Sequence, residues 1–175
     1  MALHDISSTA QTHWEIDPQN TSIEFEIGKS FLHRVKGRFH AVNGSVEAFG
    51  NRANDAMIRV EIDAASIDTR FKLRDRHLHT GQFLGVNRFP TISFAGTRVE
   101  DRGQDGIRVS GDLTIRGITR QIVLDATVEQ RDVESARIAA HTILDRRDFK
   151  IGPKAMGLVV GNEVDVRIAL ALHAR

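Results

Sequence analysis

The chain has 175 residues, of which 41% are hydrophobic and 27% are charged, so we expect one soluble globular domain with a sizeable core. Its 24 Lys and Arg nearly balance its 23 Asp and Glu, and the formal net charge of +1 excludes a global field that would attract nucleic acid or an anionic membrane. The absence of cysteine excludes disulfides, thiol catalysis and cysteine-bound metals.

The first residues, MALHDISSTAQTHWEID, have neither the basic region nor the apolar region of a signal peptide. No apolar run in the sequence approaches the ~20 residues that span a bilayer as a helix. The sequence therefore predicts a cytoplasmic protein, or a periplasmic one if this chain is a mature form. We expect residues 1–13 to be an N-terminal extension and residues 14–173 to form a single domain.

Alternating apolar and polar residues predict strands along most of the chain. The pattern is clear in SIEFEIG (22–28), MIRVEID (57–63), TISF (91–94), IRVSGDLTIRG (107–117), ITRQIVLDATVE (118–129), RIAAHTILDR (137–146) and EVDVRIALALHAR (163–175). Turn residues lie between these segments, and strands that recur every ~8–12 residues with turn signals indicate a sandwich or a barrel. Glycines inside strands, at Gly37, Gly44 and Gly111, suit the bends of a barrel. We predict an all-β antiparallel barrel of about eight strands, a size that either fills with side chains or holds one small ligand.

Residues 72–85, KLRDRHLHTGQFLG, interrupt the strand pattern and predict a short helical insertion that covers one mouth of the barrel. Pro90 ends this element, because the residue before a proline is pushed into an extended conformation. Its arginines, and the clusters HRVKGR (33–38) and RRDFK (146–150), are candidates to hold an anionic head group, since arginine binds carboxylate and phosphate in a bidentate manner. A solvated surface loop is the alternative interpretation.

Neither metal binding nor catalysis has support in the sequence. His77 and His79 have no obvious third metal ligand nearby, and a histidine buried under the insertion is the better interpretation of His77. His141 lies within a strand and is interpreted as a core or lumen histidine. Ser66, Asp68 and His77 lack the nucleophile elbow of serine hydrolases, and no basic face interleaved with aromatics indicates nucleic-acid binding.

Several segments occur together in order: WEIDPQNTSIEFEIG, VKGRF, SIDTR, RDRHLHTGQFLGVNRFPTISF, VSGDLTIRGITRQIVLDA and RRDFKIG. Together they resemble the YceI-like family over roughly residues 14–173. The resemblance implies a lipocalin-like barrel whose apolar lumen binds a polyisoprenoid or similar amphiphile, a homodimer, and no established catalysis. Two departures are that IGKSF (27–31) holds no histidine where family members commonly carry one, and that RDFKIG replaces the more usual RDFG.

We therefore predict a protein that sequesters or transports a long-chain isoprenoid, an isoprenoid quinone-like lipid or a fatty amphiphile, with no cofactor and no metal. The predicted lumen residues are Phe25, Ile27, Phe39, Ile62, Phe83, Phe94, Leu113, Leu124, Ile143 and Leu170. The predicted head-group or mouth residues are Arg38, Arg74, Arg76, His77 and Arg146. Two alternatives stay open: an enzyme acting on a lipid-like substrate in the same barrel, and a filled barrel that serves as a stress-linked interaction protein.

Overall fold

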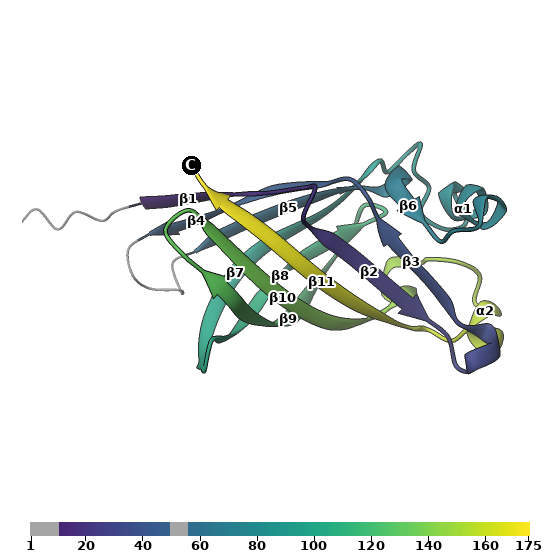
Figure 1. Cartoon of the computed structure of the whole chain (residues 1–175). Helices are drawn as coiled ribbons and strands as arrows, with labels where there is room; N and C mark the ends of the chain where they lie inside the picture. Colours follow the sequence, from purple (N-terminus) through teal and green to yellow (C-terminus); the bar gives the residue numbers. More distant parts are fainter. Residues whose placement is uncertain (1–10, 50–55) are drawn as a thin grey trace, which may run out of the picture.

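One antiparallel sheet closes on itself in the computed structural model, which describes residues 11–49 and 56–175 (Figure 1). Its strands are β1 (Gln11–Ile16), β2 (Ser22–Ile27), β3 (Val35–Phe39), β4 (Val42–Phe49), β5 (Met57–Asp63), β6 (Ile67–Asp68), β7 (Thr91–Gly103), β8 (Gly106–Ile115), β9 (Ile118–Arg131), β10 (Ser135–Asp145) and β11 (Glu163–Ala174). The helices are α1 (Lys72–His79) and α2 (Met156–Val159), with short 3₁₀ turns at Phe31–His33, Ala64–Ser66 and Arg146–Phe149.

The eleven described strand segments make eight long strands, because three of these strands are interrupted. β1 and β2 both pair with β11 and form the first interrupted strand. On one half of the barrel β4 pairs with β1 and β5 with β4, and on the other half β3 pairs with β2 and β6 with β3. The other two interrupted strands are therefore β3–β4 and β5–β6. The contact between β1 and β11 closes the barrel. The predicted antiparallel, lipocalin-like barrel of about eight strands is confirmed, and α1 is the helical insertion. β1 begins at Gln11, inside the segment predicted as an N-terminal extension.

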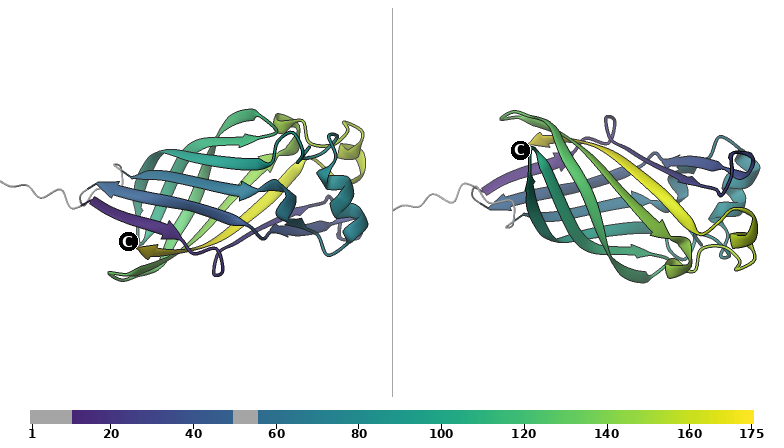
Figure 2. Two further views of the ribbon diagram at one scale, coloured as in Figure 1. Left: turned by 90° about the horizontal axis from the view of Figure 1, so that it is seen from above. Right: turned by 90° about the horizontal axis from the view of Figure 1, so that it is seen from below.

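The connections place different chemistry at the two ends of the barrel (Figures 1 and 2). One end, which we call the helical end, carries α1, α2 and the 3₁₀ turn at 31–33. The other end, which we call the hairpin end, carries the β7–β8 and β9–β10 turns and the C-terminus. Successive connections of an antiparallel barrel alternate between its ends, so loops far apart in the sequence meet at the helical end.

Glycine in two strands makes room for aromatic rings of neighbouring strands. A Cβ added to Gly37 would lie 2.4 Å from the ring of Phe25, and one added to Gly111 would lie 2.5 Å from the ring of Phe94. The tips of the Phe25 and Phe94 rings therefore occupy the space that the Cβ of any larger residue would need. These glycines shape the inner wall of the barrel in addition to bending its strands.

Replacing Gly111 with alanine is expected to lower the free energy of unfolding by about 1–3 kcal/mol, the usual cost of overpacking. The new Cβ would lie 2.5 Å from the backbone oxygen of Ala95 as well as against Phe94. Gly81→Ala is the matched control, because an added Cβ there meets nothing within 4 Å, and we expect its stability to stay within ~0.5 kcal/mol of the parent. Urea denaturation measures both variants, and equal stability of the two would contradict the prediction.

Candidate functional site

An apolar cavity of about 610 Å³ runs through the barrel and is lined by side chains from all eight long strands. The lining extends from Arg131 at the hairpin end to His77 and Met156 at the helical end. Almost all of the lining side chains are aliphatic or aromatic, and the volume lies within the ~300–1,000 Å³ of typical ligand sites. The barrel therefore contains a lumen in addition to a packed core.

Nine of the ten predicted lumen residues line this cavity, and their contact with a lipid stays a prediction. They are Phe25, Ile27, Phe39, Ile62, Phe83, Phe94, Leu113, Leu124 and Leu170. Eight of them follow from strand alternation, which sends every second side chain to the inner face, while Phe83 lies in the turn after α1. Phe25 and Phe39 come from paired strands, and their ring centroids lie 5.9 Å apart on the lumen wall.

The prediction for Ile143 is wrong, because its side chain is 57% exposed and does not line the cavity. The even-numbered residues of β10 face inward, from Ala136 to Leu144. His141 shares the outer face with Ile143, where its ring donates a hydrogen bond of 3.0 Å to Asp165, so its interpretation as a core or lumen histidine is also wrong. That hydrogen bond holds the pKa of Asp165 below its ordinary value.

Arg146 continues the inner face of β10 and is the charged side chain held deepest at this site. It is only 2% exposed and lines the cavity at the helical end. Its Nε donates to the backbone oxygen of Gly161 (3.1 Å), and its Nη1 donates to that of Ile151 (2.7 Å). Its Nη2 is buried and has no hydrogen-bond partner among the described residues. Burial lowers the pKa of the guanidinium, which nevertheless keeps its charge at neutral pH.

The other predicted head-group residues divide between the lumen and the outer surface. Arg74 and His77 line the cavity, and the His77 ring packs edge-on against Phe83 at a centroid distance of 4.9 Å. His77 is nevertheless exposed, so its interpretation as a buried histidine is wrong. Arg76 lies on the exposed side of α1 and does not line the cavity. Arg38 is also wrong as a mouth residue, because it points outward from β3 between two inward-facing positions.

Arg74 is engaged in holding α1 against the barrel. Its Nε donates to the Thr69 hydroxyl and its Nη2 donates to the Thr69 backbone oxygen, both at 2.8 Å. The Asp75 carboxylate accepts hydrogen bonds from the backbone N–H and the hydroxyl of Thr69, at 2.9 and 2.5 Å. Thr69 is 5% exposed, so these bonds fix the start of the helix at a buried point. Asp75 therefore has a structural role, because it holds the segment before α1 in place.

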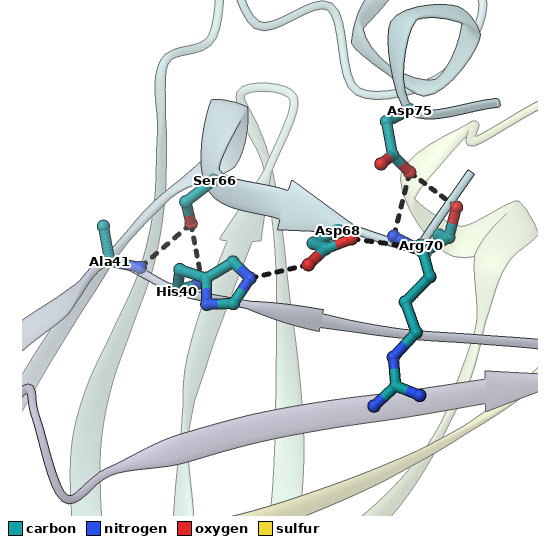
Figure 3. Close-up of polar contacts among 7 residues, drawn as sticks. His40, Ala41, Ser66, Asp68, Arg70 and Asp75 are labelled. Carbon is teal, nitrogen blue, oxygen red and sulfur yellow. Dashed lines mark hydrogen bonds and ion pairs between the residues drawn. The ribbon is translucent and has the colours of Figure 1, made fainter. Parts of the chain in front are cut away.

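Figure 3 shows the polar contacts that continue from this anchor to β3. His40 donates a hydrogen bond of 2.8 Å to Asp68, which also accepts one from the backbone N–H of Arg70. The bond from His40 is the main reason that the pKa of Asp68 lies below its ordinary value. The Ser66 hydroxyl accepts from the backbone N–H groups of His40 and Ala41, not from the His40 ring. This arrangement ties strands together and has no activated nucleophile.

Sequence reasoning missed several residues of the lumen wall. Thr142 lines it on β10, and Met156 and Val160 line it from the long β10–β11 connection. Strand alternation could have found Thr142 once the register of β10 was known. No periodic signal marks Met156 or Val160, because they lie in α2 and directly after it.

Over residues 11–49 and 56–175, no three His, Asp or Glu side chains gather in a group that could hold a metal ion. Within the same ranges, neither helix has the length and hydropathy needed to cross a membrane.

Comparison with known proteins places the chain in a family. A model described as a YceI-like domain matches residues 14–172. A UPF0312 protein of Vibrio parahaemolyticus is 30% identical over 137 residues, which are 75% of this chain and 72% of that protein. Another, of Vibrio campbellii, is 28% identical over 137 residues, with the same shares of each chain.

Solved structures share the fold at low sequence identity. BcnA of Burkholderia cenocepacia matches with a TM-score of 0.82 at 20% identity, over 89% of this chain and 98% of that chain. A polyisoprenoid binding domain from Saccharophagus degradans, implicated in plant cell wall breakdown, matches with a TM-score of 0.73 at 15% identity, over 93% and 98% of the two chains. These likenesses establish the fold, and the domain match over nearly the whole sequence establishes membership: the chain belongs to the YceI-like family.

Proposed function

We propose that this protein binds a long apolar ligand in the barrel lumen and thereby sequesters or carries it. The observation that carries the proposal is the continuous apolar lining from the hairpin end to the helical end of the barrel. A ligand tail that leaves water for this wall gains about 0.8 kcal/mol for each buried CH₂. A structural neighbour is described as a polyisoprenoid binding domain, which supports an isoprenoid tail as the first ligand to test.

The proposed ligand carries a hydrogen-bond-accepting head that reaches Arg146. This guanidinium has one buried amino group, Nη2, without a partner in the described part of the chain, and no acidic side chain there forms an ion pair with it. A buried charge left without a partner is costly, and a phosphate, carboxylate or carbonyl oxygen of a ligand would offset that cost. Polyprenyl phosphates, fatty acids and quinone-like lipids all provide such oxygen atoms.

Chain length is expected to be selected by the length of the lumen. A forty-carbon tail at ~0.8 kcal/mol per carbon would sum to ~30 kcal/mol, beyond the ~18–21 kcal/mol reached by the tightest complexes. The cost of ordering the chain and the solvation of the ligand by membranes must offset much of this gain. Tail carbons that extend beyond the lumen add little affinity, so we expect the affinity to level off with increasing length.

Mass spectrometry of organic extracts of the purified chain tests the proposal, with an unrelated protein purified in parallel as the control. A stoichiometric isoprenoid or fatty amphiphile supports a carrier and identifies the ligand class. A blank extract, repeated after incubation with octaprenyl lipids, would favour the filled barrel. Chemical conversion of the added lipid would instead favour an enzyme. The homodimer stays an implication of the family resemblance, and the cytoplasmic location, or a periplasmic one for a mature form, stays a prediction.

A further inference from the structure

Large apolar side chains are exposed on three neighbouring parts of the helical end. Leu32, in the 3₁₀ turn between β2 and β3, is 85% exposed, and Leu158 in α2 is 82% exposed. Phe71 and Leu73 at the start of α1, and Val159 in α2, are each more than half exposed. Exposed leucines and phenylalanines gathered at one end of a molecule mark an interaction surface.

The loops at the helical end are also strongly basic. Residues 28–36, 70–90 and 146–162 contain twelve Lys and Arg against two Asp and no Glu. Since the whole chain has 24 basic and 23 acidic residues, the rest of the chain has twelve basic and twenty-one acidic residues. The net charge of +1 therefore conceals a charge separation between these loops and the rest of the protein. Four exposed lysines in these loops form no ion pair with any described residue: Lys29, Lys72, Lys150 and Lys154.

The three loops form one continuous surface, which we call the docking face (residues 28–36, 70–90 and 146–162). The backbone N–H of Gly152 donates to the Gln82 oxygen at 2.9 Å, which joins the β10–β11 connection to the loop after α1. A Cβ on Gly161 would lie 3.1 Å from the side chain of Lys29, which places that connection beside the β2–β3 loop. Figures 1 and 2 show the helices of these loops at the same end of the barrel.

The docking face is continuous with the lumen. His77 on α1 and Met156 on α2 line the cavity, while Leu73 and Leu158, on the same two helices, point into solvent. A lipid that entered or left the lumen between these helices would pass directly from these exposed apolar side chains to the lumen wall. Loops that expose both apolar side chains and lysines match an interface that is anionic outside and apolar beneath.

We propose that the docking face binds the surface of an anionic lipid bilayer, with Leu32, Leu158 and the side chains around them inserted among the acyl chains. Lysines near such a surface attract anionic head groups, and the attraction decays over a Debye length. The chain thereby presents its helical end to the membrane while the acidic remainder stays in water. The docking does not depend on which ligand the lumen holds, so it extends the proposed function and is tested separately.

Flotation of the full chain with lipid vesicles tests this proposal. The chain is expected to bind vesicles that contain 30% phosphatidylglycerol at least tenfold more strongly than vesicles of pure phosphatidylcholine, and to lose most of this preference in ~0.5 M salt. Leu32→Ser combined with Leu158→Ser, and separately Lys150→Glu combined with Lys154→Glu, should each lower binding at least tenfold. All four side chains are exposed, so the barrel should fold normally, as a thermal melt will show.

Matched controls lie away from the docking face. Val133→Ser removes an 88% exposed apolar residue from the β9–β10 turn at the hairpin end, and Arg102→Glu combined with Arg137→Glu reverses two exposed charges outside the three loops. Both controls should bind vesicles as the parent does. Absent binding, equal binding to both kinds of vesicle, or an equal loss with the controls would overturn the proposal. Because no ligand is added, these outcomes are independent of what the lipid extract contains.

Discussion

Replacing Ala140 with tryptophan is expected to weaken binding of a long apolar ligand more than a hundredfold while the barrel stays folded. Ala140 lies on the inner face of β10, opposite Ala126 on one side and Ile168 on the other, and all three side chains line the lumen. An indole at this position would occupy space that the ligand tail needs. Displacing four or five methylene groups would remove about 3–4 kcal/mol of binding free energy, which is more than a hundredfold in Kd.

Ala139→Trp is the matched control, because it adds the same side chain one residue away on the outer face. Ala139 does not line the cavity and lies opposite Ala169 on β11. Titration with a fluorescent polyprenyl alcohol should give parent-like affinity for Ala139→Trp and a Kd more than a hundredfold higher for Ala140→Trp. Both variants should keep the far-UV circular dichroism of the parent. Equal affinity of the two variants would show that the ligand binds outside the lumen.

Strand alternation was sufficient to predict most of the lumen wall. Because side chains alternate with a period of two, one inward-facing residue determines which residues of the whole strand face inward. It failed on β10, where both faces carry apolar or small residues. Residues directly opposite each other in an antiparallel pair share a face, and Ile143 lies opposite Asp165 while Leu144 lies opposite Val164. That register is set across the long β10–β11 connection instead of a tight turn, so the sequence of β10 alone could not reveal it.

Two head-group predictions show which side-chain directions strand alternation can reveal and which it cannot. Arg38 and Phe39 are neighbours on one strand, so the correct prediction that Phe39 faces inward already implied that Arg38 faces outward. Arg146 is different, since alternation predicts its direction only when the register of β10 is known. Its burial and its partners depend on Gly161 and Ile151, which come from the irregular loop that follows.

The meeting of the cation clusters depends on topology and not on any one motif. HRVKGR begins in the β2–β3 connection and runs into β3, and the α1 segment and RRDFK belong to two other connections. An antiparallel barrel brings connections to one end when the number of strands between them is even. Two long strands, β3–β4 and β5–β6, lie between the first and second of these connections, and four, β7 to β10, lie between the second and third. The sequence predicted the clusters and the approximate strand number, but the breaks within β1–β2, β3–β4 and β5–β6 made an exact count of strands impossible from the pattern.

Replacing Arg146 with methionine is expected to remove the preference for ligands with an acidic head. Parent protein should bind a polyprenyl phosphate at least tenfold more tightly than a hydrocarbon of equal length, because a hydrogen bond to a charged group contributes about 1.5–3 kcal/mol. Arg146→Met should bring the ratio of the two affinities close to one. The ratio is the informative quantity, because both ligands are measured on the same folded variant.

The variant will also be less stable, because the Gly161 and Ile151 oxygens lose their donors, at about 1–3 kcal/mol for each unsatisfied group. Removing a buried charge that has no acidic partner offsets part of this loss.

Arg147→Met is the control, since Arg147 is exposed and forms its ion pair with Asp145 on the outer surface, with Nη2 2.5 Å from a carboxylate oxygen. If Arg147→Met lost the head-group preference and Arg146→Met kept it, the head would lie outside the barrel, and the unpartnered Nη2 of Arg146 would have no part in ligand selection.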